Sequence, residues 1–229
     1  MIMLQWQDIE TVLLDMDGTL LDLHFDNQFW IHHLPKRYAE LNQLPPAQVQ
    51  QQMAAKYQAM QGQLDWYCFD FWERELNLEL MPLKQELAHL IKIRPSVIDF
   101  LTALKQSHCK VILLTNSHRK GLQMKFALTD IEQYFDQVIS SHDYGYCKEQ
   151  QAFWQAAETA LEFKPEQSLF IDDSLAVLQA AQTYGIAHLI AVNQPDSQQP
   201  VRQINQFNAL THFDELTRDL KNSLAHANS

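Results

Sequence analysis

The chain has 229 residues, of which 46% are hydrophobic, and its 17 basic and 28 acidic side chains give a formal net charge of −11. This composition supplies a sizeable core and suits one large domain, or one domain that carries an insert. The acidic balance argues against nonspecific binding to nucleic-acid polymers and anionic membranes, and no apolar run approaches the ~20 residues that span a bilayer.

The N-terminus and the cysteines indicate a reducing compartment. The first ten residues lack a basic start and a long apolar run, so no secretory signal is expected. Cys68, Cys109 and Cys147 are widely spaced and odd in number, which favours free thiols. We therefore expect a cytoplasmic protein, and the sequence is compatible with either a monomer or a homodimer.

Five short apolar runs predict strands. They are rich in Val, Ile and Leu, as parallel strands covered on both faces are. Segments whose apolar residues have helical spacing lie between several of these strands. Alternating strands and helices predict a doubly wound, Rossmann-like parallel α/β sheet. The predicted strands are Val12–Leu14, Val111–Leu114, Val138–Ile139, Leu169–Ile171 and His188–Val192, and the predicted helices are Pro95–Gln106, Gln150–Leu161, Leu175–Tyr184 and Asp214–Leu224.

The segment after the first strand does not show this alternation of strands and helices. Residues 23–92 contain no convincing strand, and apolar residues at 49, 53, 57 and 60 have helical spacing. Leu64–Leu76 is helical in spacing and strongly aromatic. We therefore predict an all-helical cap domain at residues 23–92, inserted into an α/β catalytic core formed by residues 1–22 and 93–229.

Two aspartates follow the first predicted strand directly. Asp15 and Asp17 lie at its carboxyl end, which is where open α/β sheets bind ligands. Alternation along an extended chain sends both side chains the same way, and like charges held together favour protonation or a bound cation. Gly18 then allows a sharp turn. A solvated turn is the ordinary explanation for such a motif on its own.

Three later strand ends carry matching groups. Thr115 and Asn116 end the second strand, Lys148 follows the third, and Asp172 and Asp173 end the fourth. Each alone is explained by a turn, a helix cap or a solvated lysine. Together, and in this order, they suit phosphoryl transfer, because a hard cation such as Mg²⁺ prefers oxygen ligands and screens the carboxylates from an anionic phosphate.

These motifs resemble the haloacid dehalogenase superfamily of phosphatases. The match comprises "DMDGT" at 15–19, "LLTN" at 113–116, Lys148 and "IDDS" at 171–174, and many members carry a helical cap directly after the first motif. The stretches "WQDIETVLLDMDGTLLDLHFDNQFW", "LDWYCFDFWERELNL" and "YGIAHLIAV" further resemble the bacterial 5′-nucleotidases of this superfamily that act on GMP and IMP. The resemblance implies a purine nucleoside monophosphate as the small-molecule substrate.

The resemblance also implies roles for the site residues. Asp15 is the expected nucleophile, which forms an aspartyl-phosphate, and Asp17 the expected acid and base. Mg²⁺ is expected on the Asp15 carboxylate, the Asp17 backbone carbonyl and Asp172, with support from Asp173. The expected substrate contacts are Met16, Asp17, Thr115, Asn116 and Lys148, of which Thr115, Asn116 and Lys148 are also counted as catalytic.

Residues early in the cap are candidates for reading the base. Phe25, Asn27 and Trp30 lie closest in sequence to the catalytic strand, and aromatic faces stack on purines. Asp26 or Asn27 is a candidate for contacting the purine edge. Packing inside the cap is the competing explanation for each aromatic ring.

Other functions remain open at this stage. The core motifs do not select the leaving group, so a sugar-phosphate phosphatase of the phosphoglycolate or hexose-phosphate type is the main alternative. A phosphoglucomutase-type transferase and a non-catalytic phosphate-binding module rank lower, because Asp15, Asp17, Lys148 and Asp172 are all present. In the superfamily, an aspartate at the position of Asp17 favours phosphatases over dehalogenases.

Overall fold

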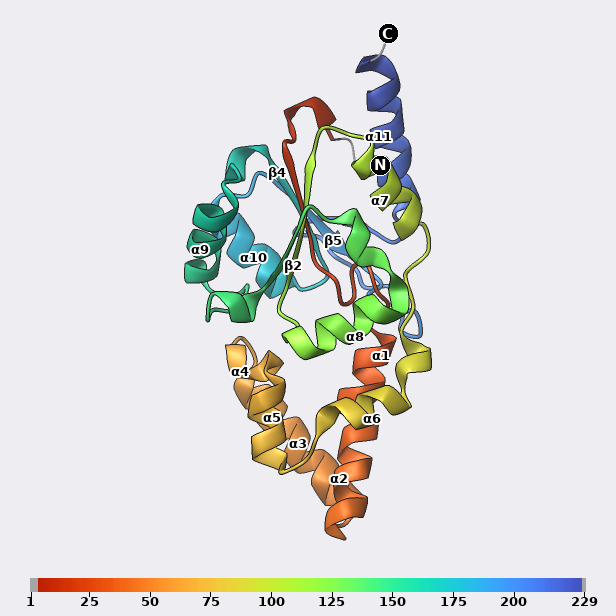
Figure 1. Ribbon diagram of the computed structural model, residues 1–229, viewed down its shortest axis with the longest axis vertical. Helices are drawn as coiled ribbons and strands as arrows, with labels where there is room; N and C mark the ends of the chain where they lie inside the picture. The colour runs from red at the N-terminus through yellow and green to blue at the C-terminus, as the bar shows by residue number, and fades with distance from the viewer. Residues whose placement is uncertain (1–3, 228–229) are drawn as a thin grey trace.

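Six parallel strands form the centre of the computed structural model, which describes residues 4–227 (Figure 1). The sheet order is β3-β2-β1-β4-β5-β6, which is the doubly wound order with its reversal between β1 and β4. The strands are β1 (Thr11–Leu14), β2 (Lys110–Thr115), β3 (Gln137–Ser140), β4 (Ser168–Asp172), β5 (His188–Val192) and β6 (Asn208–Leu210).

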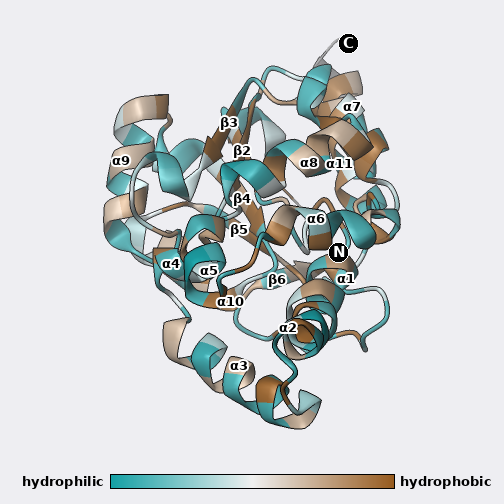
Figure 2. Cartoon of the chain, turned by 60° about the horizontal axis from the view of Figure 1, so that its bottom comes forward, coloured by the Kyte–Doolittle hydropathy of each residue, from teal (hydrophilic) through white to brown (hydrophobic). Residues whose placement is uncertain are grey.

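Helices cover both faces of the sheet, as an all-parallel sheet requires. Val12 and Leu14 of β1 pack into the core shared with α7, α8 and α11, while Leu13 packs into the core shared with α9 and α10. Figure 2 shows mainly hydrophobic strands and helices with both hydrophobic and hydrophilic residues, as expected for fully buried strands and half-buried helices. The helices are α7 (Val97–Lys105), α8 (Arg119–Thr129), α9 (Gln151–Leu161), α10 (Leu175–Tyr184) and α11 (Asp214–Ala227), with short helical turns η1 (Trp6–Asp8), η4 (Ile131–Tyr134), η5 (Ser141–Asp143) and η6 (Pro165–Gln167).

Residues 23–92, between β1 and α7, are largely helical and lie at one end of the sheet (Figure 1). We call residues 23–92 the cap segment and the other described residues the core segment; that they form separate domains stays a prediction. The cap elements are α1 (His24–Asn27), the π-helical η2 (Gln28–His33), α2 (Leu34–Asn42), α3 (Pro46–Met60), α4 (Leu64–Tyr67), α5 (Phe69–Leu76), α6 (Leu80–Glu86) and η3 (Ala88–Leu90).

The cap segment has its own aromatic core. Trp72 is fully buried, and its ring lies 6.0 Å from Trp30, 6.0 Å from Trp66 and 5.2 Å from Tyr57 between centroids. Tilted and edge-to-face pairs at these separations stabilise a cluster beyond the area that they bury. The cap segment therefore has a rigid aromatic centre independent of the sheet.

The two ends of the cap segment lie side by side next to β1. The backbone N–H of Asp22 donates to the carbonyl of Lys92 at 2.9 Å, and Leu21 pairs with Ile93 in an antiparallel bridge. The whole cap segment therefore leaves and rejoins the core segment at a single point.

Polar contacts hold the cap segment against the core segment. Lys120 of α8 pairs with Asp70 of α5 at 2.6 Å, and the hydroxyl of Tyr67 donates to Glu149 at 2.6 Å. The structure thus has the cap closed over the carboxyl edge of the sheet.

The fold class predicted from the sequence is confirmed, with two elements that the sequence patterns did not indicate. Helix α8 buries Gly121 and Lys125 beside Leu122 and Phe126, which breaks the apolar period. Strand β6 has only three residues and begins with an exposed Asn208. The three cysteines are free, as predicted, and no helix within residues 4–227 is long and apolar enough to cross a membrane.

Candidate active site

The carboxyl ends of three neighbouring strands build the site. Leu14 of β1 pairs with Leu113 of β2 and with Ile171 of β4. This register brings Asp15 and Asp172, which lie one position beyond those pairs, to the same edge of the sheet. Because β1 lies between β2 and β4, the first aspartate is flanked by groups from both neighbours.

Lys148 joins the two strand ends. It lies between η5 and α9 and is 2% exposed, and its Nζ atom donates to Asp15 Oδ1 at 2.6 Å and to Asp172 Oδ2 at 2.7 Å. A third hydrogen bond, of 3.0 Å, reaches the carbonyl of Leu114. All three ammonium donors are therefore used, which fixes this charge beside the Asp15 carboxylate.

The burial of these groups perturbs their titration. Burial raises the pKa of Asp15 to about 6, against the opposing charge of Lys148 and with reinforcement from Asp172. Burial also acts to lower the pKa of Lys148, but the two carboxylates more than offset it and hold the lysine protonated. One cation thus faces two carboxylates, and the site retains a negative charge that favours another cation.

The neighbouring oxygens fit a hard divalent ion. One carboxylate oxygen from each of Asp15, Asp172 and Asp173 lies within 4.8 Å of the other two. Among the described residues, Asp15 Oδ2 is buried without a hydrogen-bond partner, and burial raises the pKa of Asp173 well above its usual value. Mg²⁺ prefers oxygen ligands from one or two carboxylates, so this group suits it.

The carboxylate of Asp17 points to a different partner from that of Asp15. Asp17 Oδ1 accepts a hydrogen bond of 2.6 Å from Lys125 of α8, and the same ammonium reaches Asp26 of α1 at 2.6 Å. Asp26 also pairs with Lys84 of α6 at 2.9 Å. Burial raises the pKa of Asp17 to about 6, whereas in Asp26 burial is outweighed by the two lysines, which hold its pKa at about 2.

Gly18 allows the chain to turn sharply after Asp15 and Asp17. Its φ is +87°, and a Cβ atom there would lie 2.7 Å from the Cγ atom of Asp173. Its N–H donates to the carbonyl of Leu21 at 2.8 Å, which closes the turn. A side chain at this position is excluded both by the backbone conformation and by the carboxylate beside it.

Thr115 and Asn116 shape the loop after β2. The Thr115 hydroxyl accepts a hydrogen bond of 3.0 Å from the N–H of Ser117. The Asn116 side chain accepts a hydrogen bond of 2.9 Å from the N–H of Lys148 and donates one of 3.0 Å to Glu149. Asn116 therefore anchors the lysine loop with its side chain.

A cavity of about 780 Å³ opens between this edge and the cap segment. Trp30 and Asn27 line it, as do Thr115, Asn116 and Lys148. Its remaining polar lining includes amide side chains from α3 and its C-terminal end, while the apolar lining is mostly aromatic. The residues concerned are Gln50, Gln58, Gln61, Tyr57, Trp66, Tyr67 and Phe69.

Two residues from the sequence analysis lie outside the cavity lining, and two others line it but have partners within the protein. Met16 and Phe25 are buried and are not part of the cavity lining. Asp26 lines the cavity, but Lys84 and Lys125 bind its two carboxylate oxygens, so it is not free to read a purine edge. The side-chain N–H of Asn27 donates to Asp196 at 2.8 Å.

The sequence patterns gave no indication of Lys84, Lys125 or Glu149 as site residues. Lys84 and Lys125 are each 2% exposed and far apart in the chain, and their shared partner is Asp26. Lysines this deeply buried occur almost only in ion pairs. Only the position of Lys125 on the buried face of α8 could have indicated its role, and the sequence patterns did not predict that helix.

Comparisons with known proteins agree with this geometry. The model of the haloacid dehalogenase-like hydrolase family matches residues 9–185. The chain is 40% identical over 215 residues to GMP/IMP nucleotidase YrfG of Escherichia coli (strain K12), covering 94% of this chain and 97% of that protein. It is 25% identical over 186 residues to pyrophosphatase PpaX of Bacillus mycoides, covering 77% and 80%.

The structure is similar to that of a HAD phosphatase from Thermococcus onnurineus, with a TM-score of 0.76 at 19% identity, covering 93% of this chain and 98% of the other. That likeness supports the fold. Because the family model spans more than half of the chain and the Escherichia coli relative aligns along nearly all of it, this chain belongs to the haloacid dehalogenase-like hydrolase family and is a hydrolase.

Proposed function

We propose that this hydrolase is an Mg²⁺-dependent phosphomonoesterase that acts on purine nucleoside 5′-monophosphates through an aspartyl-phosphate. The observation that carries the proposal is the carboxylate of Asp15. Its Oδ2 atom is buried and has no hydrogen-bond partner within residues 4–227, the residue lines the cavity, and Lys148 donates to its other oxygen. The GMP/IMP nucleotidase name of the Escherichia coli relative supports the choice of substrate.

The reaction would proceed in two steps. Asp15 attacks phosphorus, the bond to the ribose O5′ breaks, and Asp17 gives its proton to that oxygen. Asp17 then removes a proton from water, which attacks the aspartyl-phosphate and releases phosphate. A pKa of about 6 in the metal-free protein suits a carboxyl that must first give and then take a proton near neutral pH.

The remaining groups would bind the phosphoryl oxygens. Lys148 contributes a fixed positive charge, and the Thr115 hydroxyl and the backbone N–H of Asn116 contribute hydrogen bonds. Asp15, Asp172 and the Asp17 backbone carbonyl would hold Mg²⁺, with Asp173 beside them. The ion supplies neutralisation of the carboxylates and of the phosphate, which allows an anionic nucleophile to approach an anionic ester.

The lining of the cavity favours a nucleotide over a smaller ester. A volume of about 780 Å³ lies within the range of roughly 300–1,000 Å³ that is usual for ligand sites. Trp30 and Trp66 offer faces on which a purine stacks, and Gln50 and Gln58 offer amides, and Asn27 an amide oxygen, to its edge. A sugar phosphate would leave much of this aromatic surface without a partner.

The test is a panel of phosphate esters assayed for kcat/KM with Mg²⁺. We expect GMP and IMP to exceed hexose phosphates and phosphoglycolate by at least about 10-fold. A sugar phosphate at the head of the panel would favour the runner-up function. Phosphate transfer to a second sugar hydroxyl would indicate a mutase, and a folded, Mg²⁺-loaded protein without turnover would indicate a binding module.

A pair of cap variants tests base stacking separately. Trp30→Ala removes a ring that lines the cavity, whereas Phe71→Ala removes a ring that packs on Trp72 outside the lining. Trp30→Ala should raise KM for GMP much more than KM for p-nitrophenyl phosphate, and Phe71→Ala should not. Equal effects of Trp30→Ala on both substrates would contradict the role of Trp30.

A further inference from the structure

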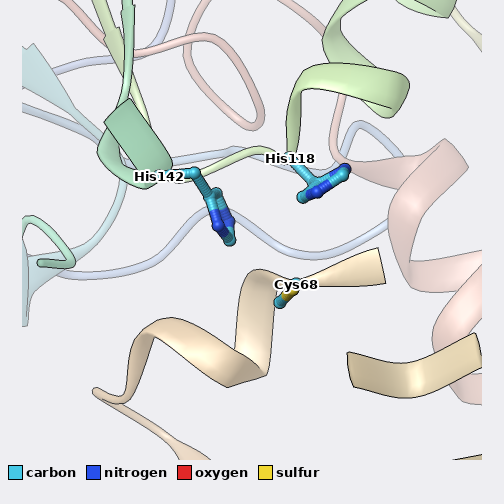
Figure 3. Close-up of side chains that lie close together, drawn as sticks. All are labelled: Cys68, His118 and His142. Atoms are coloured by element: carbon cyan, nitrogen blue, oxygen red, sulfur yellow. The ribbon is translucent and has the colours of Figure 1, made fainter. Parts of the chain in front are cut away.

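Figure 3 shows three side chains of types that bind metals, Cys68, His118 and His142, close to one another. Cys68 lies between α4 and α5, His118 caps the N-terminus of α8, and His142 lies in η5 after β3. One ligand atom from each lies within 4.8 Å of the other two. The thiol comes from the cap segment and both imidazoles come from the core segment.

The proposed phosphatase chemistry does not use this cluster. Cys68 and His142 are outside the cavity lining, and only His118 reaches it. Among the described residues, the Nε2 atom of His142 is buried and forms no hydrogen bond of good geometry, although backbone groups of Tyr67 and Asn116 lie near the ring. A buried ring nitrogen without a partner is unfavourable unless a ligand satisfies it.

Packing orients the cluster. The His118 ring stacks on Phe69, with centroids 5.4 Å apart and planes at 16°, and it meets His142 edge-to-face at 5.0 Å. Phe69 follows Cys68 directly in the chain, so this stack places the Cys68 backbone near His118.

The ligand atoms of Cys68, His118 and His142 favour a different metal ion from the one that the three aspartates favour. A thiolate and two imidazoles suit Zn²⁺, while carboxylates suit Mg²⁺. Tetrahedral Zn²⁺ with bonds of about 2.0–2.3 Å holds its ligand atoms roughly 3.3–3.8 Å apart, so atoms within 4.8 Å need to approach by at most about 1.5 Å. Three protein ligands leave the fourth position to water or to a bound molecule.

We propose that Cys68, His118 and His142 bind a soft divalent transition metal such as Zn²⁺, which joins the cap segment to the core segment. The full ligand set exists only while the cap is closed, because the thiol and the imidazoles come from different segments. Binding therefore stabilises the closed arrangement at the expense of the open one. Zn²⁺ would slow any turnover that requires the cap to open.

The decisive experiment uses alkylation of the native, Mg²⁺-saturated protein. Cys68 is part-exposed while Cys109 and Cys147 are buried, so a thiol reagent reports mainly on Cys68. Zn²⁺ should slow this alkylation by at least about 10-fold, because a metal-bound thiolate is not available to attack. His142→Gln should abolish that protection, and His89→Gln, which changes an exposed histidine of η3, should retain it.

Direct binding provides the second measurement. Equilibrium dialysis of Zn²⁺ against saturating Mg²⁺ should show one site in wild type and in Cys109→Ser that is missing in Cys68→Ser. Thermal melts establish that each variant is folded. Unchanged alkylation with Zn²⁺, or equal Zn²⁺ binding by wild type and Cys68→Ser, would overturn the site.

Inhibition of hydrolysis by Zn²⁺ gives a third measurement. Of the three measurements, only this one rests on the proposed function. Zn²⁺ should slow hydrolysis of p-nitrophenyl phosphate by wild type far more than by Cys68→Ser. A protein that hydrolyses no ester but shows Zn²⁺ protection of Cys68 would contradict the proposed function and support the metal site.

Discussion

The Nζ atom of Lys125 lies 2.6 Å from Asp17 Oδ1, and the same ammonium is held at 2.6 Å by Asp26. Lys125 belongs to α8 of the core segment, while Asp26 belongs to α1 of the cap segment. The proposed acid and base is thus oriented by a lysine that the cap itself holds in place. Cap closure and the readiness of Asp17 are therefore linked through one buried cation.

Replacing Lys125 by methionine tests this positioning role. Lys125 acts to lower the pKa of Asp17, so Lys125→Met should raise that pKa and shift the pH profile of kcat upward. We expect kcat to fall by about 10²-fold, the lower end of what a general acid contributes. Arg119→Gln, which removes a surface pair with Asp143 inside the core segment on the same helix, should keep the wild-type profile. A pH profile that Lys125→Met does not move would contradict the link.

Asp15→Asn should eliminate turnover without unfolding the chain. The amide cannot form an aspartyl-phosphate, so we expect a loss of at least about 10³-fold in kcat. The change removes one of two carboxylates that share Lys148, and so it relieves repulsion with Asp172. Turnover and thermal unfolding measured on one preparation check both parts, and near-normal activity would mean that another group is the nucleophile.

The metal-free protein should become less stable as the pH rises from about 4 to 6. The pKa of Asp15 and of Asp17 is raised by burial to about 6, above the unfolded value, so the folded chain binds more protons than the unfolded chain in this range. The sign of the linkage then makes the free energy of unfolding fall as these protons are lost, by roughly 2–5 kcal/mol.

Mg²⁺ should remove this decline, because the cation favours the ionised carboxylates. Urea unfolding between pH 4.5 and 7.5, in EDTA and in Mg²⁺, measures both curves. A free energy of unfolding that rises with pH over this range in EDTA would show that burial does not dominate the titration of Asp15 and Asp17.

Gly18→Ala should damage both the site and the fold. The added methyl group would lie 2.7 Å from Asp173 Cγ, in a backbone conformation with φ of +87°. Gly62→Ala is a matched control, because its φ is +75° and nothing lies within 4 Å of the added carbon. Both variants carry the backbone penalty of about 1 kcal/mol, but only Gly18→Ala should also weaken Mg²⁺ binding and lower kcat. Equal losses in the two would contradict a specific clash.

Site residues at the ends of the strands could be predicted from the sequence. Asp15 and Asp172 could be expected together, because adjacent parallel strands in register bring their carboxyl ends to one edge. The pairing of Lys125 with Asp26 could not, since these residues are 99 positions apart and meet only when the cap closes. Nor does spacing in the chain reveal that Cys68 lies beside two histidines of the core segment.

The pairing of Leu21 with Ile93 means that the cap segment could be replaced without changing the sheet. Since the chain leaves and re-enters the core at adjacent positions, with a single antiparallel bridge across the junction, the sheet does not depend on how long the intervening segment is. The cost of closing such a loop grows only slowly with its length. A different cap could occupy the same junction and present another leaving group to an unchanged Asp15, so substrate choice can change independently of the chemistry at the strand ends.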